Sequence, residues 1–251
     1  MLRKIRKYVL KQYATPGFLG IWVTPFYFTQ RELYLKMVQM APALKGQLLD
    51  VGCGGKPYRG LFEHENNHYV GIEFDTPETR KANNADYFYG GDVFPFEDAT
   101  FDGIVCNQVL EHVFNPDTFL DEIFRVLKPD GAFLVSVPFV WDEHLQPFDY
   151  ARYSSFGLRS LLERHGFVLI EAHKMNADLR AIFQIINVYL HKILLTRNGK
   201  INLLLCAIFM APVTLLGIVL SKLLPANPDL FLSQIVLAKK RRKNEFDEKS
   251  H

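Results

Sequence analysis

Cysteine is scarce in this sequence of 251 residues, which contains only Cys53, Cys106 and Cys206. Their number is odd and their spacings match no zinc-ligand motif, so we expect neither a disulfide framework nor a structural zinc site. A secretory signal is also missing, because the first fifteen residues alternate basic and apolar side chains without a long uncharged run. Both absences predict a protein of a reducing cytoplasm.

The chain also lacks an overall excess of charge of one sign, since its formal net charge is only +2. Hydrophobic residues make up 49% of the chain and charged residues 22%, which excludes a disordered protein and suffices for a buried core. The basic residues gather at the two ends, as Arg3, Lys4, Arg6, Lys7, Lys11, Lys239, Lys240, Arg241, Arg242 and Lys243. Such ends suit an anionic membrane or a nucleic acid, or they are simply solvated charge.

A third glycine is missing from the nucleotide-binding pattern LLDVGCGGKPYRGLF at 48–62. An apolar run ends at Asp50, and Gly52 and Gly54 then let the backbone turn tightly and approach a ligand. A dinucleotide fingerprint places its third glycine where this chain has Pro57. Proline removes a backbone donor and adds bulk, so the loop predicts a ligand that does not present a phosphate there.

Two acidic residues follow this loop at the ends of expected strands. Glu73 lies nineteen residues after Gly54, where a carboxylate accepts hydrogen bonds from both hydroxyls of a ribose. Asp92 lies nineteen residues after Glu73, where it accepts a hydrogen bond from an adenine amino group. The glycines and the two acids together predict an adenosine site.

Strands alternate with helices from residue 46 onward, which predicts an α/β protein with a parallel sheet and a ligand at the carboxyl ends of its strands. Strands are expected at 47–53, 68–74, 85–90, 101–107, 132–139, 167–173 and 232–240. One helix has Asn115 as its N-cap and Pro116 at its first position, and Pro129 and Gly131 stop it. Other helices are expected at 2–13, at 28–40 and after a serine cap at 154 or 155.

Four motifs in order resemble the class I S-adenosylmethionine-dependent methyltransferases of the type 11-like subgroup: LLDVGCGG, VGIE, GDVFPFEDATFD and NQVLEHV. The resemblance covers about residues 48–173, and it implies a Rossmann-like methyltransferase fold with a mostly parallel seven-stranded sheet and helices on both faces. It also implies S-adenosyl-L-methionine as the cofactor. A Rossmann-like domain that no longer binds a cofactor is the alternative.

The resemblance assigns parts of that cofactor to individual residues. The methionine part is expected at Asp50, Gly52, Cys53 and Gly54, the ribose at Glu73, the adenine at Asp92 and Val93, and the methyl group above Asn107 and Gln108.

Two regions offer side chains for methyl transfer to a hydroxyl, whose proton must be removed. Glu111 and His112 follow the fourth strand, where the resembling family often faces its substrate, and local capping or packing is the alternative. The loop PFVWDEHLQPFDYARYSS at 138–155 resembles the DY.RY segment of methyltransferases found with bacterial surface-polysaccharide synthesis. We expect His144 as the general base, with His112 as the alternate. The expected acceptor wall consists of Glu111, Asp149, Tyr150, Arg152 and Tyr153.

Two of these residues allow a second interpretation. Arg152 binds an anionic group of the acceptor or forms a structural ion pair. Glu111 and His112 are adjacent, and two adjacent ligands are weak evidence for a metal, so no metal is assigned.

Residues 203–220 form an uncharged run of the length at which a membrane span becomes a candidate. The helix before it is amphipathic, with Gln184, Asn187 and His191 opposite its apolar face. If 232–240 completes the sheet, the chain returns to the side it left, which excludes a single span. Two spans would place Lys192 and other cationic residues on the far side of the membrane, although lysine and arginine are usually enriched on the cytoplasmic side. We therefore expect a helical hairpin in the membrane interface; a buried cap or dimer surface is the alternative, and a true span returns if the last strand is misassigned.

The expected organisation is 1–45 as basic amphipathic helices, 46–178 as the cofactor-binding core, 179–224 as an apolar helical insertion, 225–240 as the last strand and 241–251 as a charged tail. We expect O-methylation of a glycan, lipid-linked or quinone-like acceptor by a cytoplasmic protein on the inner face of the membrane. The alternatives are a methyltransferase of a soluble small molecule with a homodimeric hairpin, and a non-catalytic adaptor in a membrane glycan-assembly complex. No basic stripe flanks the cofactor edge, so nucleic acid is not an expected partner.

Overall fold

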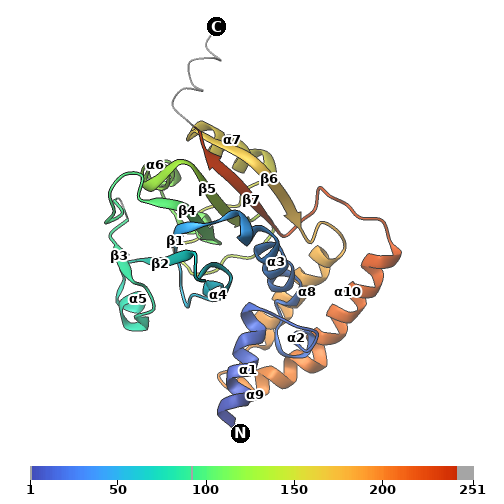
Figure 1. Ribbon diagram of the computed structural model, residues 1–251. Helices are drawn as coiled ribbons and strands as arrows, with labels where there is room; N and C mark the ends of the chain where they lie inside the picture. The colour runs from blue at the N-terminus through green and yellow to red at the C-terminus, as the bar shows by residue number, and fades with distance from the viewer. Residues whose placement is uncertain (1, 92, 242–251) are drawn as a thin grey trace. The chain divides into compact units, whose positions relative to one another are not determined.

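The computed structural model describes residues 2–91 and 93–241, with side chains described from Tyr8 onward. Its strands form one seven-stranded sheet in the order β3-β2-β1-β4-β5-β7-β6 (Figure 1). Neighbouring strands from β3 to β5 pair in parallel, and β7 runs antiparallel to β6, so the sheet is mixed but mostly parallel. The strands are β1 (Gly46–Val51), β2 (Asn67–Phe74), β3 (Tyr87–Tyr89), β4 (Phe101–Asn107), β5 (Leu127–Pro138), β6 (Phe167–Met175) and β7 (Ser233–Lys240).

The helices fall before, between and after these strands, as the alternating pattern predicts. They are α1 (Leu2–Ala14), α2 (Gly20–Val23), α3 (Tyr27–Met40), α4 (Arg59–Phe62), α5 (Pro77–Ala82), α6 (Pro116–Val126), α7 (Ser155–Arg164), α8 (Arg180–Leu194), α9 (Gly199–Leu205) and α10 (Ala211–Leu223). Short turns of 3-10 helix are η1 (Ala41–Ala43) and η2 (Leu110–His112), and η3 (Cys206–Met210) is a π-helical turn. Because η3 joins α9 to α10, Gly199–Leu223 is one continuous helix.

The chain forms two compact units. The helical unit comprises the described residues of 1–36, 139–142 and 174–233, and the sheet unit comprises those of 37–138, 143–173 and 234–251. The helical unit therefore combines the N-terminal helices with the segment between β6 and β7. The sheet unit holds every described residue that the sequence assigns to the cofactor.

The core of the sheet unit lies where α6 and α7 pack on the sheet. Phe119, Leu120 and Ile123 of α6 join Leu158 and Leu162 of α7 in one buried cluster with the apolar residues of β1, β4 and β5. The opposite face of the sheet buries Leu44 and Leu48, among others. Layers on both sides leave the ends of the strands, rather than their faces, for a ligand.

The helix caps that the sequence predicts are confirmed. The Asn115 side chain accepts a hydrogen bond from the Thr118 N–H at 3.4 Å, and Pro116 occupies the first turn of α6. Ser154 caps α7 by accepting from the Gly157 N–H at 3.1 Å. Such caps are local interactions, and they were therefore predictable.

The predicted end of α6 is wrong. Pro129 and Gly131 were expected to stop the helix, but α6 already ends at Val126 and β5 begins at Leu127. Leu127 pairs with Phe101 of β4, and the register shifts between Phe101 and Gly103. A long-range strand pairing thus ends the helix before its local stop residues are reached.

Candidate active site

The loop after β1 requires glycine at position 52. Gly52 has φ +72°, and a Cβ built there would lie 2.4 Å from Cγ2 of Val109. Its N–H and that of Cys53 both donate to the carbonyl of Ile72 in β2, at 2.9 and 3.2 Å. The loop is therefore folded back over the end of β2, in a conformation that other residues adopt only with strain.

Gly54 and Glu73 meet at this edge, as the sequence predicts for a ribose site. The Gly54 N–H donates to Oε2 of Glu73 at 2.8 Å, and Oε1 accepts from the Phe74 N–H at 3.2 Å. Gly54 has φ +49°, and apart from its chain neighbours no atom of the described residues lies within 4 Å of the position that its Cβ would occupy. A ligand can therefore approach the backbone here, next to a half-exposed carboxylate.

Asp50 and Cys53 are buried beneath the loop. Asp50 is 6% exposed and accepts a short hydrogen bond from the Tyr69 hydroxyl. Burial, opposed by that hydrogen bond, raises the pKa of the Asp50 carboxyl to about 7. Burial also raises the pKa of the Cys53 thiol to about 12, so this cysteine is not a thiolate nucleophile at neutral pH.

Three residues that the sequence analysis missed brace this loop. Tyr69 holds Asp50, while Lys56 pairs with Asp86 at 2.7 Å. Asp86 also accepts from the Gly71 N–H at 2.7 Å. The Lys56 side chain packs so closely on Gly71 that a Cβ at this position would clash with it. No motif marks these contacts, because the Tyr69–Asp50 contact depends on the register of β1 against β2 and the Lys56–Asp86 pair joins two loops thirty residues apart.

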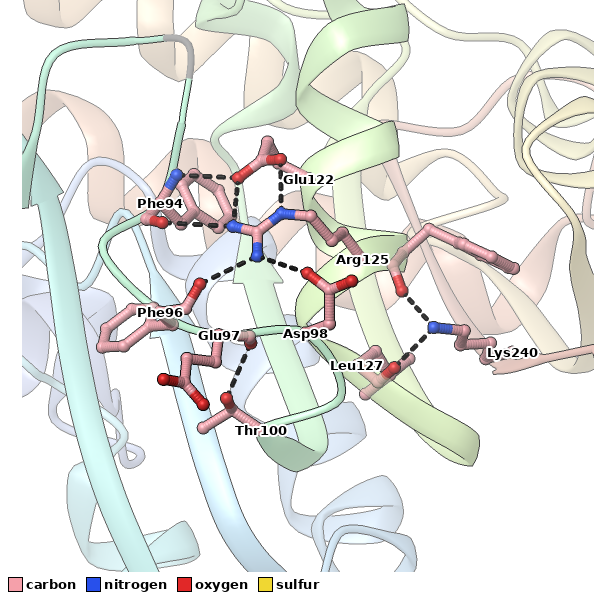
Figure 2. A network of polar contacts seen from close by, with 10 residues as sticks. Phe94, Phe96, Glu97, Asp98, Thr100, Glu122, Arg125, Leu127 and Lys240 are labelled. Atoms are coloured by element: carbon pink, nitrogen blue, oxygen red, sulfur yellow. Dashed lines mark hydrogen bonds and ion pairs between the residues drawn. The ribbon is translucent and has the colours of Figure 1, made fainter.

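The predicted adenine side is only partly described. Asp92 lies outside the described residues, and Val93 is 65% exposed. The segment that follows is held by Arg125 of α6 (Figure 2). Arg125 donates to the carbonyls of Phe94 and Phe96 at 3.1 and 2.8 Å, and it pairs with Glu122 at 2.7 Å.

The same network binds both the backbone N–H and the carbonyl of Phe94. The Phe94 N–H donates to Oε2 of Glu122 at 2.8 Å, and Arg125 also pairs with Asp98 at 2.8 Å (Figure 2). Arg125 and Glu122 are thus positioning residues for the stretch that begins one residue after Val93. The sequence analysis missed this role, although FPFEDATFD was singled out.

The ends of β4 and β5 are tied together beneath the expected methyl group. Ser136 donates to Oδ1 of Asn107 at 2.5 Å and accepts from Nε2 of Gln108 at 3.2 Å. The Gln108 N–H donates to the Ser136 carbonyl at 3.0 Å, with Gln108 at φ +54°. Asn107 and Gln108 are thus held together through Ser136, a residue that the sequence analysis missed.

Glu111 is the most unusual group of the site. Its carboxylate is fully buried, and neither oxygen has a hydrogen-bond partner among the described residues. Burial raises the pKa of this carboxyl to about 8. The carbonyl of Glu111 accepts from the N–H groups of Tyr150 and Ala151 at 2.8 and 3.2 Å, so this residue also anchors the DY.RY loop.

His112 and His144, the two candidate bases, lie side by side with ring centroids 4.7 Å apart. Nε2 of His112 lies 3.8 Å from Oε1 of Glu111, and its Nδ1 lies 2.6 Å from the Phe148 carbonyl. Nδ1 of His144 lies 3.3 Å from Oδ2 of Asp149. Burial, with the neighbouring His144 as a further contribution, lowers the pKa of His112, which favours a neutral imidazole.

Arg152 forms the structural ion pair that the sequence left as one of two alternatives. Its guanidinium donates to both oxygens of Asp149 at 2.6 Å, and this pairing lowers the pKa of the Asp149 carboxyl to about 2. Tyr153 lies half-buried against the core, whereas Tyr150 is 45% exposed and contacts Phe114 edge to face. Tyr150 is therefore the more accessible member of the predicted acceptor wall.

Comparisons with known proteins identify the arrangement. Residues 49–135 match the family model described as a methyltransferase domain. A probable S-adenosylmethionine-dependent methyltransferase of Mycolicibacterium smegmatis is 31% identical over 160 residues, which cover 59% of this chain and 62% of that protein. This chain contains a class I S-adenosylmethionine-dependent methyltransferase domain.

Two further proteins resemble the methyltransferase domain. The 24-methylenesterol C-methyltransferase 2 of Arabidopsis thaliana is 31% identical over 47% of this chain and 35% of its own length. The structure of Haemonchus contortus phosphoethanolamine N-methyltransferase 2 with S-adenosyl-L-methionine has a TM-score of 0.56 at 17% identity and covers 90% of this chain and 56% of that one. The chain thus spans less than two thirds of each relative, and the structural likeness shows the Rossmann-like methyltransferase fold.

The cofactor of the methyltransferase domain is S-adenosylmethionine, and the described residues fit it. Open space at Gly54 lies beside the Glu73 carboxylate, which would hold the ribose, and Asn107 and Gln108 would lie below the methyl group. When bound, the cofactor supplies an electrophilic methyl group on a positively charged sulfonium. Asp50 contributes negative charge beneath the loop when it is ionised, and the Arg125 network fixes the segment after the adenine residues.

Proposed function

We propose that this protein methylates a hydroxyl of a lipid-linked sugar, glycolipid or quinone-like acceptor at the inner face of the cell membrane, and that its helical unit lies in the membrane interface. The observation that carries the proposal is an inverted distribution of side chains in the helical unit. Its interior buries amide and hydroxyl side chains beside apolar ones, and large apolar side chains are exposed on its outside.

Two fully buried amide side chains of α8 connect the segments of the helical unit. Gln184 of α8 is fully buried, accepts from the Phe28 N–H at 3.1 Å and donates to the Pro25 carbonyl at 2.8 Å. Asn187 is also fully buried and donates to the hydroxyl of Thr214 in α10 at 2.8 Å. The contact between α8 and α10 is close, since a Cβ at Gly217 would lie 2.9 Å from Phe183. Small residues and polar bonds between helices are typical of helix packing in a membrane.

The outside of the helical unit is apolar on several helices at once. Its exposed large apolar residues include Ile182, Ile186, Tyr189, Ile193, Ile201, Leu204, Ile208, Phe209, Leu216, Val219 and Leu223, with exposed fractions of 40–72%. Leu10, Phe18, Leu19 and Trp22 of the N-terminal part are exposed as well. A water-soluble monomer rarely exposes so extensive an apolar surface, whereas a lipid environment stabilises it.

The lengths of the two arms favour an interfacial hairpin over a crossing. Gly199–Leu223 has a mean hydropathy of 2.7 over its most apolar window, with only 28% of that window buried, and it is long enough to cross a bilayer. The chain leaves the sheet at β6 and returns to it at β7, so a crossing would need a second span. With 15 residues, α8 is about 22 Å long, which is short of the roughly 30 Å of a hydrocarbon core.

The chain itself links the acceptor region to the helical unit. Residues 139–142 belong to the helical unit, where Trp141 contacts Phe26 and Asp142 pairs with Lys192 of α8 at 2.6 Å. His144 follows Asp142 by two residues. The loop that supplies the candidate base therefore begins on the apolar unit, which suits an acceptor that is itself lipid-bound.

One reported relative supports a lipid acceptor but not methylation of oxygen. The protein of Arabidopsis thaliana is named for methyl transfer to a sterol carbon. Methyl transfer to oxygen is proposed because burial lowers the pKa of His112, which then offers a neutral imidazole, beside His144, for the removal of a hydroxyl proton.

Co-sedimentation of the full chain with phospholipid vesicles tests the membrane surface. We expect binding that anionic lipid strengthens and salt partly weakens, because lysines and arginines near the surface act through screened charge. The double variant Tyr189→Glu with Val219→Glu should bind at least about tenfold more weakly, since each change removes buried apolar area worth more than 1 kcal/mol.

Phe156→Glu is the matched control, because Phe156 is 81% exposed on α7 of the sheet unit and should leave binding unchanged. Wild-type protein that stays in the supernatant would refute the membrane surface. If Val219→Glu instead dissociated a dimer in solution, the homodimeric methyltransferase of a soluble substrate would take its place.

A further inference from the structure

Glu111, His112 and His144 converge from two segments of the sheet unit that lie far apart in the chain. Glu111 and His112 belong to η2, just after β4, whereas His144 belongs to the loop after β5. One carboxylate oxygen and one nitrogen from each imidazole all lie within 4.8 Å of one another. A single ion at their centre can contact all three after small side-chain rotations.

The Glu111 carboxylate needs a partner that the described protein does not provide. It is fully buried, and neither of its oxygens has a hydrogen bond to another described residue. An isolated buried carboxylate is costly, and proteins normally retain one only when it is paired or coordinates a metal. This orphaned side chain is an observation independent of the clustering itself.

The surroundings orient the two imidazoles as metal ligands are oriented. The Phe148 carbonyl can only accept, so Nδ1 of His112 carries the hydrogen and Nε2, the nitrogen nearer Glu111, presents its lone pair. Nδ1 of His144 faces the Asp149 carboxylate, which is itself held by Arg152 and by the His144 N–H at 2.9 Å. A histidine that donates from one nitrogen to a carbonyl or carboxylate and binds metal through the other is a recurring arrangement.

We propose that Glu111, His112 and His144 bind one divalent transition-metal ion. Two imidazoles and one carboxylate are the ligand set of catalytic zinc and related ions, which keep a further position open. The imidazole side chains are 15% and 33% exposed, so that position can be reached from outside.

The site lies three residues beyond Gln108, at the strand end where the methyl group is expected. A metal there would bind the acceptor oxygen and lower the pKa of its hydroxyl, whose proton would pass to water. His112 and His144 would then serve oxygen methylation as metal ligands, in place of the base role given under the proposed function. This role rests on the proposed function, whereas the metal site does not.

Calorimetric titration of the chelator-treated full chain with Zn²⁺, without a histidine tag, tests the site. We expect one ion per chain and a loss of affinity of at least about 100-fold in His144→Gln. Removal of a residue that only hydrogen-bonds to a metal ligand typically costs about 10–100-fold. Glu111→Gln should lose affinity as well while keeping the fold, because glutamine has nearly the same shape and adds no charge to the interior. With Co²⁺ in place of Zn²⁺, a visible absorption band should appear in the wild type and be absent from both variants.

His68→Gln is the control, since His68 is exposed at the start of β2, at the far end of the strands. Glu73→Ala should keep full Zn²⁺ affinity, which separates failure of the metal site from failure of cofactor binding. A folded wild type that binds no Zn²⁺, or equal binding by the wild type and both site variants, overturns the proposal.

Discussion

Asp50 is an ionisable residue held where ionisation is unfavourable. It is buried beneath the cofactor loop, next to Glu73 and Lys56, and it accepts from Tyr69. Burial raises the pKa of its carboxyl to about 7, so the folded state binds this proton more tightly than the unfolded chain does. The stability that this group supplies is complete below about pH 4 and is lost as the pH rises through about 7.

Asp50→Asn should therefore become more stable relative to the wild type as the pH rises. Between pH 5 and pH 8 the difference in the free energy of unfolding should shift by about 2–3 kcal/mol in favour of the variant. Urea denaturation of both proteins without cofactor, across this range, measures the shift. Parallel pH profiles would show that Asp50 ionises normally in the folded protein.

Single residues of the site were predictable where their chemistry is local. Gly52 and Glu73 follow from the loop and from the strand that ends beside it, and both lie as expected. Tyr69 and Ser136 were missed, because a tyrosine or serine in a strand becomes a site residue only through the register of neighbouring strands. The raised pKa of Asp50 also arises from burial, which the sequence does not reveal.

At the scale of elements, α8 is inverted relative to a helix of a soluble protein. Periodicity separates its polar face from its apolar face, but it does not tell which face is buried. Here Gln184 and Asn187 face inward, and Ile182, Ile186 and Tyr189 face outward. The pairing of Gln184 with the backbone of Pro25 and Phe28, and of Asn187 with Thr214, fixes the orientation.

This inversion predicts opposite effects on the two faces of α8. Gln184→Ala should lower the free energy of unfolding by about 2–4 kcal/mol, because a buried N–H and a buried carbonyl lose their partner. Ile186→Gln should change it by no more than about 0.5 kcal/mol and should raise the soluble fraction in buffer without detergent. Chemical denaturation and centrifugation measure both, and the reverse order of effects would contradict the inversion.

The boundary between α6 and β5 shows what local patterns miss. Asn115 and Pro116 fix the start of α6 through hydrogen bonds within one turn. Its end is set by the pairing of Leu127 with Phe101, residues that are distant in the chain. Helix starts were therefore predicted more closely than this helix end.

At the scale of the whole molecule, the candidate site and the exposed apolar surface belong to different compact units. The sheet unit contains the described cofactor residues and the cluster of Glu111, His112 and His144, and the helical unit contains the apolar exterior. The sequence predicts that the carboxyl ends of β4 and β5 lie on the same side of the sheet, but the meeting of His144 with Glu111 depends on how the long loop after β5 folds. That contact could not be predicted from spacing.

Calorimetric titration with S-adenosylmethionine tests the central claim, that this sheet edge is a working cofactor site, most directly. The wild type should bind in the micromolar range, and Glu73→Ala should bind at least about tenfold more weakly, since it removes a charged hydrogen-bond acceptor worth roughly 1.5–3 kcal/mol. Glu78→Ala, which removes the same charge from the exposed first turn of α5, should bind like the wild type. A folded wild type that does not bind, or equal binding by all three proteins, would contradict the account and favour the non-catalytic adaptor.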